Sequence, residues 1–196
     1  MKNEFLETIR VEDGIHFHLS YHQNRYANVL KILNAKKIQR LDTYLDAPKK
    51  GLYRCRLRYN LQKIIDVEYL EYKKREINSL KLVYDDAIDY SFKYCDRKNI
   101  DKLFALREDY DDIIIVKNGF ITDTSISNIA LFDGEWKTPA SPLLKGTTRA
   151  RYLNEGKLIE ADIRVIDIKN FTKIALLNAM IDFDIIHQHK LKDIFC

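Results

Sequence analysis

Hydrophobic and polar positions along the chain follow the periods of short strands and a few helices. Residues 5–11 alternate like a half-buried strand, Asp13-Gly14 is a turn signal, and residues 15–17 would pair back as a hairpin. Residues 19–35 then carry apolar side chains at helical spacing. Alternation predicts three further strands, at residues 51–59, 64–72 and 77–84. The first part of the chain is therefore expected to form an antiparallel α+β unit.

The pattern changes after Asp85-Asp86, where an irregular segment at residues 87–97 precedes a predicted helix at residues 99–107. Beyond this crossover, Asn118-Gly119 and Asp133-Gly134 are turn signals between short apolar segments. Strands are predicted at residues 113–116, 120–122, 128–132, 136–138, 163–168 and 174–177, and a helix at residues 146–154. The sequence thus predicts an α+β fold with antiparallel-rich sheets and flanking helices. Its parts would be a small N-terminal α+β domain (1–86), a crossover (87–97) and a larger C-terminal α/β domain (98–196).

Composition narrows the class of protein. The 196 residues are 46% hydrophobic, enough to bury a core, and 32% charged, with a formal net charge of +4. Acidic residues interrupt every basic run, which favours an anionic small-molecule substrate over nucleic acid. No apolar run approaches the roughly 20 residues that cross a bilayer, and residues 1–4 lack the apolar region of a signal peptide, so a cytoplasmic location is expected. Cys55, Cys95 and Cys196 are widely spaced and indicate neither a disulfide framework nor a metal site.

A glycine and two hydroxyls stand where a strand-like segment turns into the predicted helix at residues 146–154. Gly146 would let an anion approach the first N–H groups of that helix, and Thr147 and Thr148 would donate to the anion. The same residues also fit a plain helix N-cap. The distinction depends on whether other residues of the chain require a phosphate at this point.

Three further residues could take part in such a site. Arg25 lies on the polar face of the first predicted helix, and its guanidinium could hold a phosphate or simply be solvated. Lys93 stands among aromatic residues at the crossover, where it could act as an amine nucleophile or base, or cover apolar surface with its stem. Asp123 lies among hydroxyls at a strand end, either in an ordinary polar loop or as the partner of a pyridinium nitrogen.

Five motifs in one order resemble the class IV aminotransferase family of pyridoxal 5'-phosphate (PLP) enzymes, which have fold type IV. The motifs are Phe5-Leu6-Glu7-Thr8-Ile9-Arg10, His22-x-x-Arg25, Lys93-x-x-Asp96-Arg97, Thr122-Asp123-x-Ser125-x-Ser127-Asn128 and Leu144-Lys145-Gly146-Thr147-Thr148-Arg149. Each motif is weak alone, but their order spans nearly the whole chain. The resemblance implies a two-domain fold like that of D-amino acid aminotransferase, and a homodimer.

The resemblance also implies roles for individual residues. Lys93 would form a Schiff base with PLP and then move the proton at the substrate carbon. Asp123 would pair with the pyridine nitrogen of the cofactor. The remaining cofactor contacts would come from Arg25, Gly146, Thr147 and Thr148 at the phosphate and from Ser127 and Asn128 near the ring. Candidate substrate contacts are Arg54 and Arg56, which could instead face solvent, and Asn178 and Ala179.

Three activities are found on the scaffold that the chain resembles. The short chain and its opening motif favour aminodeoxychorismate lyase, which releases pyruvate and gives 4-aminobenzoate for folate synthesis. A branched-chain or D-amino acid aminotransferase is the alternative, and a non-catalytic member of the fold is the second alternative. Asp123 replaces the glutamate usual in the family with a carboxylate one methylene shorter, and Asp96 replaces the usual asparagine.

Overall fold

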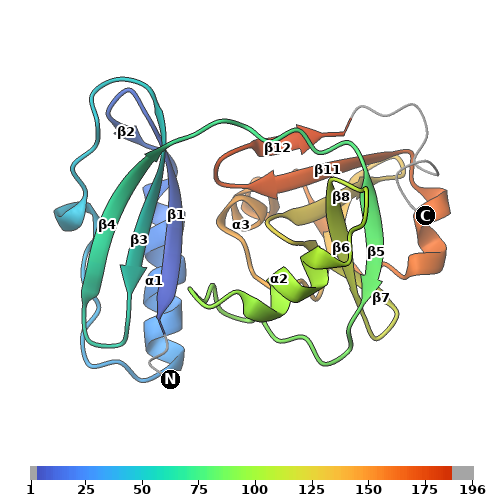
Figure 1. Cartoon of the computed structure of the whole chain (residues 1–196), viewed down its shortest axis with the longest axis horizontal. Coiled ribbons are helices and arrows are strands. Elements are labelled where there is room, and N and C mark those ends of the chain that lie inside the picture. The colour runs from blue at the N-terminus through green and yellow to red at the C-terminus, as the bar shows by residue number, and fades with distance from the viewer. Residues whose placement is uncertain (1–3, 187–196) are drawn as a thin grey trace. The chain divides into compact units, whose positions relative to one another are not determined.

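The chain divides into two compact units in the computed structural model, which describes residues 4–186. The first unit runs to Lys74 and also takes in Phe92–Asp96. The second unit comprises Arg75–Ser91 and the chain from Arg97 onward. Figure 1 labels helices and strands of both units where there is room. The chain therefore leaves the second unit once, at the segment that contains the predicted lysine, and returns to it.

The first unit is an antiparallel sheet with a helix on one face. Its elements are β1 (Phe5–Glu12), β2 (Ile15–His16), α1 (Leu19–Ile32), the 3-10 helix η1 (Leu41–Tyr44), β3 (Leu52–Tyr59) and β4 (Ile64–Glu71), and the strand order is β2-β1-β3-β4. Asp13 and Gly14 both have positive φ, which suits the two-residue turn between β1 and β2. α1 buries Tyr26, Val29 and Leu30 against the sheet. The predicted hairpin and the two strands after the helix are confirmed.

The second unit is built on a larger, mostly antiparallel sheet. Its strands are β5 (Leu80–Tyr84), β6 (Asp112–Lys117), β7 (Phe120–Thr124), β8 (Asn128–Phe132), β9 (Trp136–Pro139), β10 (Ile159–Ala161), β11 (Lys173–Asn178) and β12 (Asp182–Ile185). The order along the sheet is β10-β9-β8-β7-β6-β5, and β11 pairs with both β8 and β12. Ile129 and Leu176 pack into one apolar cluster, whereas Ala130 and Leu177 pack into another. Alternation along β8 and β11 thus gives the sheet a buried apolar surface on both faces.

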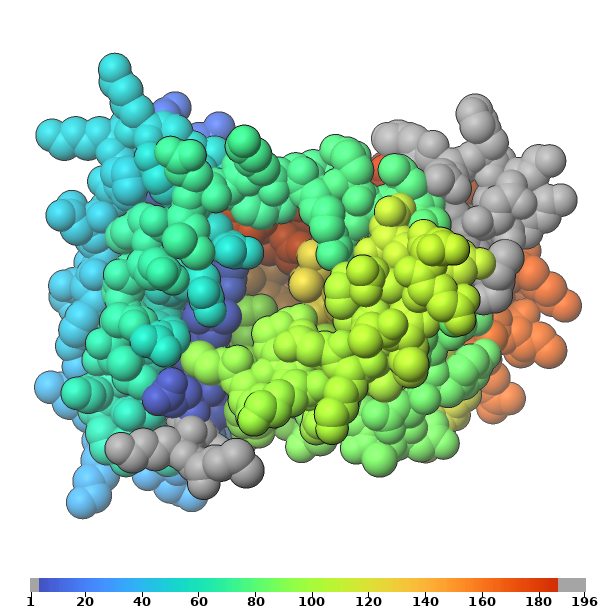
Figure 2. Space-filling model, viewed as in Figure 1, coloured from blue at the N-terminus to red at the C-terminus, as the bar shows by residue number. Residues whose placement is uncertain are grey.

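The α-helices in the described part of the chain are few and short. α1 has 14 residues, and α2 (Lys98–Ala105) and α3 (Thr147–Asn154) have 8 each. Among residues 4–186, no helix is long and apolar enough to cross a membrane. α2 lies at the surface of the second unit, where it appears in lime in Figure 2, and buries Ile100 and Leu103. All three helices confirm predicted ones.

The position of β5 corrects the expected division of the chain. β5 pairs in parallel with β6, and parallel strands need a crossover connection between them. That connection contains both α2 and Phe92–Asp96. The strand predicted at residues 77–84 therefore belongs to the second sheet, and the boundary between the units falls at Lys74 rather than at residue 86.

The strand predicted at residues 163–168 is wrong, because a 3-10 helix, η2 (Val165–Asn170), occupies most of this segment. Arg164 N–H donates to the Asp167 side chain over 3.2 Å, and Asp167 N–H donates to Arg164 O over 3.0 Å. These two bonds close a turn. Ile163 and Ile168 are buried at the ends of the segment, so its apolar residues anchor a turn instead of alternating along a strand. The short strands β10 and β12 were not predicted.

Candidate active site

A buried carboxylate joins β1 to α1 in the first unit. Glu7 is 0% exposed, and its Oε2 lies 2.7 Å from Nδ1 of His22. Arg25 donates from Nε to Glu7 Oε1 over 2.9 Å and from Nη2 to Glu7 Oε2 over 2.5 Å. His22 and Arg25 are three residues apart and therefore lie on the same face of the helix. The spacing of the His22-x-x-Arg25 motif thus directs both side chains to one carboxylate.

Opposing effects set the charge of this cluster. Burial acts to raise the pKa of Glu7, but the charge of Arg25 and the hydrogen bonds from His22 and Arg25 lower that pKa to about 2. Burial lowers the pKa of His22, and the hydrogen bond to Glu7 opposes this shift. Glu7 is therefore ionised at neutral pH. The Arg25 side chain, expected on a polar helix face, is only 13% exposed and is held by that charge.

Lys93 lies in the same unit, beside the start of β1. Leu6 N–H donates to Lys93 O over 2.9 Å, and Cys95 N–H donates to Glu4 O over 2.9 Å. These bonds fix the backbone on both sides of the lysine. The charge of Lys93 contributes to the lowered pKa of His22, so the ammonium group lies within electrostatic reach of that ring. The first two motifs, together with Lys93 and Asp96 of the third, therefore lie in one unit, whereas Arg97 belongs to the other.

The opposite face of this sheet carries the basic residues of β3. Arg56 Nη1 lies 3.5 Å from Glu68 Oε2 on β4, and both side chains are exposed. Arg54 pairs in register with Leu70, which offers no charge, and Arg54 makes no hydrogen bond or ion pair within the described part of the chain. Of the two predicted substrate arginines, Arg56 has an exposed carboxylate 3.5 Å away as its partner, and Arg54 has no ionic partner among the described residues.

In the second unit, Asp123 occupies a buried position on β7. It is 5% exposed, and its Oδ1 accepts from Asn128 Nδ2 over 2.7 Å while its Oδ2 accepts from Leu144 N–H over 2.8 Å. Burial raises the pKa of Asp123 to about 6, although these hydrogen bonds and the charge of Arg149 favour the ionised form. A buried carboxylate that is bound only by neutral donors is suited to a cationic partner.

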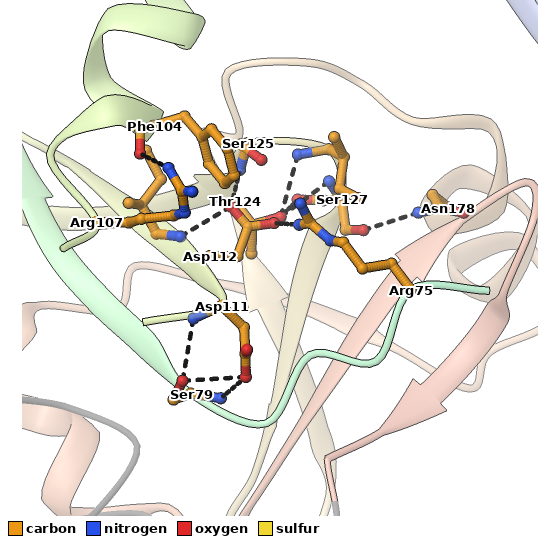
Figure 3. Close-up of polar contacts among 12 residues, drawn as sticks. Arg75, Ser79, Phe104, Arg107, Asp111, Asp112, Thr124, Ser125, Ser127 and Asn178 are labelled. Carbon is orange, nitrogen blue, oxygen red and sulfur yellow. Dashed lines mark hydrogen bonds and ion pairs between the residues drawn. The ribbon is translucent and has the colours of Figure 1, made fainter. Parts of the chain in front are cut away.

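Hydrogen bonds fix the loop between β7 and β8. Thr124 Oγ1 accepts from Ser127 N–H over 3.0 Å, within the loop. Asn178, at the end of β11, donates from Nδ2 to Ser127 Oγ over 2.9 Å, as Figure 3 shows. Asn178 Oδ1 also accepts from Met180 N–H over 2.9 Å, across Ala179. Asn178, predicted as a substrate residue, thus closes the turn after β11 and holds Ser127.

A second buried carboxylate supports the same loop from β6. Asp112 Oδ1 accepts from Ser125 N–H over 3.4 Å, and its Oδ2 accepts from Arg75 Nη2 over 2.8 Å (Figure 3). Burial raises the pKa of Asp112 despite these bonds. The Arg75 guanidinium also lies over the Phe104 ring, 5.4 Å from its centroid. Arg97 Nη2 donates to Ser125 O over 2.9 Å. The loop is therefore held by Arg97, which precedes α2, and by Asp112 of β6, which is itself bound by Arg75.

The first turn of α3 is suited to an anion. Gly146 is the N-cap residue, no side chain caps the helix, and no acidic residue lies in its first turn. Thr147 and Thr148 follow and are buried. The N–H groups at a helix start, together with the positive end of the helix dipole, favour a negative charge. This turn begins two residues after Leu144, whose N–H binds Asp123.

Each unit contains groups of kinds that PLP enzymes use. The first unit holds an amine, Lys93, and the second holds a buried carboxylate and a helix start suited to an anion. The mixed fold, rich in antiparallel strands, is that of fold type IV. The sequence profile of the amino-transferase class IV family matches residues 4–188. The chain belongs to this family, whose cofactor is PLP.

Known proteins similar to this chain agree with that assignment. An uncharacterised protein of Haemophilus influenzae is 40% identical over 181 residues, which cover 89% of this chain and 96% of that protein. A crystal structure from Haemophilus somnus, of a protein proposed to be a 4-amino-4-deoxychorismate lyase, is 34% identical, with a TM-score of 0.83 over 92% of this chain and 97% of the other. A hypothetical aminotransferase of Mycobacterium tuberculosis in its PLP-bound form is 17% identical, with a TM-score of 0.78 over 95% and 80% of the two chains. The last similarity shows a shared fold.

Sequence reasoning gave no role to several buried charged residues that hold the two clusters. Glu7 lies within the first motif, residues 5–10, yet its pairing with Arg25 depends on how β1 packs against α1. Asp112 is the first residue of β6, one residue before the apolar strand predicted at residues 113–116, and its burial follows from the packing of that strand. Arg149 is buried and donates from Nη2 to Pro139 O over 2.8 Å and to Glu160 Oε1 over 2.7 Å. Glu7 thus fixes the Arg25 side chain, Asp112 supports the loop between β7 and β8, and Arg149 ties α3 to β9 and β10.

Proposed function

We propose that this protein is a PLP-dependent lyase of the aminodeoxychorismate type, which releases pyruvate and 4-aminobenzoate. The observation that carries the proposal lies in the second unit. Leu144 binds the Asp123 carboxylate and leads directly into the uncapped first turn of α3. A buried carboxylate for a pyridinium nitrogen and a turn suited to a phosphate match the two ends of PLP. The identity of 34% with the Haemophilus somnus protein supports the lyase.

Particular side chains would hold the two ends of the cofactor. Asp123, with a pKa of about 6, is ionised at neutral pH and would keep a proton on the pyridine nitrogen. Thr147 and Thr148 would donate to the phosphate from the start of α3. Arg25, fixed by Glu7, would add its positive charge at the phosphate. Ser127 and Asn128 would complete the pyridine end, the first by closing the loop and the second by the contact with Asp123.

The chemistry of the reaction would fall to one side chain of this chain. PLP, when bound, withdraws electrons from the α-carbon of an amino compound. Lys93 would attach the cofactor through Nζ and would then carry a proton to or from that carbon. The backbone bonds on both sides of Lys93 would limit where its amine can reach.

Arg54 and Arg56 would bind carboxylates of the substrate. Arg54 has no ionic partner among residues 4–186, and the contact of Arg56 with Glu68 is exposed and 3.5 Å long. We expect Arg54→Ala to raise KM about tenfold with little change in kcat, because only substrate binding loses an ion pair. Lys63→Ala, on the turn between β3 and β4, is the control for a change in net charge. A KM that stays at the wild-type value would remove Arg54 from the site.

One comparison of activities tests the proposed reaction. Release of 4-aminobenzoate and pyruvate from aminodeoxychorismate is measured beside amine transfer from D- and L-amino acids to 2-oxoglutarate, with Lys93→Ala as the blank. Release without transfer is the expected result. Transfer without release would make the protein a branched-chain or D-amino acid aminotransferase, and the absence of both in PLP-loaded protein would favour a non-catalytic member of the fold. The proposal includes a homodimer, which sedimentation of the purified chain would test.

A further inference from the structure

Asn128 lies where three segments of the second unit meet. It is buried at the start of β8, and its Nδ2 donates to Asp123 Oδ1 over 2.7 Å and to Leu144 O over 2.8 Å. Leu144 N–H donates to the other oxygen of the Asp123 carboxylate over 2.8 Å. The three residues therefore form a closed ring of hydrogen bonds. Both partners of Nδ2 are acceptors, so the orientation of the Asn128 amide is determined by its surroundings.

The ring explains the glycine at position 146. Gly146 has φ −70° and ψ 150°, a conformation that any residue can adopt, so the backbone itself does not require glycine. A Cβ atom at this position would lie 3.1 Å from Asn128 Cγ and closer still to Asn128 Oδ1. The amide could move away only by giving up its hydrogen bonds to Asp123 and Leu144. Any side chain at position 146 would therefore break the ring.

We propose that Asn128 is a positioning residue that locks the Asp123 carboxylate to the segment leading into α3, and that position 146 must be glycine to admit the Asn128 amide. The inference rests on the proposed function, since the two groups it locks are those that would bind the two ends of PLP. It revises the expectation from the sequence, in which Gly146 made room for a phosphate and Asn128 contacted the cofactor. The spacing between carboxylate and helix start is thereby set before the cofactor binds, which reduces the ordering that binding requires.

A double-mutant cycle between the two positions tests the proposal in protein without cofactor. Gly146→Ala and Asn128→Ala are each expected to lower the urea midpoint of unfolding. In the Asn128→Ala background, Gly146→Ala should leave the midpoint unchanged, because the new methyl group then enters the space of the missing amide. Independent losses that add in the double variant would overturn the proposal. If Asn128→Ala does not fold, Asn128→Ser, which is smaller and keeps one donor, takes its place in the same cycle.

Binding of PLP gives the second measurement. Each single substitution should weaken PLP binding about tenfold, the effect of losing one hydrogen bond to a charged group, and the double variant should bind as Asn128→Ala does. Asn128→Asp keeps the shape but removes both donors, and it should weaken binding at least as much; wild-type affinity in this variant would contradict a positioning role. Failure of the wild-type protein to bind PLP, with an intact stability cycle, would refute the proposed function and leave the link between positions 128 and 146 standing.

Discussion

Replacement of Glu7 by glutamine should remove a pH-dependent part of the stability of this protein. The Glu7 carboxylate is fully buried, lies 2.7 Å from His22 Nδ1 and accepts two hydrogen bonds from Arg25. Glutamine keeps the size of the side chain but loses its charge, and its NH2 group cannot accept a hydrogen bond. The substitution would leave the Arg25 guanidinium beside a neutral amide, and removing one partner of a buried pair is the costly way to break it.

The size of the effect follows from the pKa of Glu7. That pKa falls from 4.5 to about 2 in the folded protein, which at ~1.36 kcal/mol per unit corresponds to about 3 kcal/mol of stability. Because the folded value lies below the unfolded one, this stabilisation is fully present above pH 4.5 and is lost as the pH falls through about 2. Glu7→Gln should therefore be less stable than wild type by about 3 kcal/mol at pH 7, and the gap should close in acid.

Urea unfolding of both proteins at a series of pH values between 7 and 2 measures this gap. Glu68→Gln is the matched control, since it removes a carboxylate from an exposed pair with Arg56 and should cost less than ~1 kcal/mol. A difference between wild type and Glu7→Gln that stays constant from pH 7 to pH 2 would refute the reasoning. It would mean that the buried cluster contributes packing and not charge.

Two further predictions concern the second unit. The pKa of Asp123 is raised from 3.8 to about 6, so its ionised form opposes folding above that pH. Wild type without cofactor should therefore gain about 2 kcal/mol in unfolding free energy relative to Asp123→Asn as the pH falls from 7 to 4, opposite in sign to Glu7. Stabilities of the two proteins that change in parallel with pH in urea unfolding would contradict this. Arg75→Ala leaves the buried carboxylate of Asp112 without its cation and should cost about 1–3 kcal/mol in urea unfolding. Arg107 lies over the same Phe104 ring as Arg75 but binds no carboxylate among the described residues, so Arg107→Ala should cost less. Equal losses of stability in the two variants would show that stacking on the ring alone matters.

Helices and strands with a regular spacing of apolar residues could be predicted from the sequence. Features that depend on contacts with residues distant in the sequence could not. The alternation in residues 5–11 and the helical spacing in residues 19–35 record which face each element buries, and both elements form. Residues 163–168 are also rich in apolar side chains, but a turn closed by the Asp167 side chain determines their structure. The sheet to which the strand at residues 77–84 belongs is decided by pairing with β6, about thirty residues away in sequence, which no local pattern records.

The same distinction applies to the candidate site. Motif order was enough to single out Lys93 and Asp123, because spacing along the chain is visible in the sequence. Their supporting contacts join residues far apart in sequence: Glu7 with Arg25, and Asn128 with the backbone before Gly146. Such contacts depend on how the elements pack, so glycine at position 146 acquires its physical reason only when the Asn128 side chain is placed in three dimensions.

Reduction of the PLP-loaded protein with borohydride, followed by peptide mass mapping, tests the central claim most directly. The claim predicts that the added pyridoxyl phosphate group is found on Lys93, and that Lys93→Ala acquires neither the added mass nor the visible absorption of the bound cofactor. Attachment to Lys73, Lys74 or Lys81 would contradict the role of Lys93. A wild-type protein that takes up no PLP would contradict the claim as a whole.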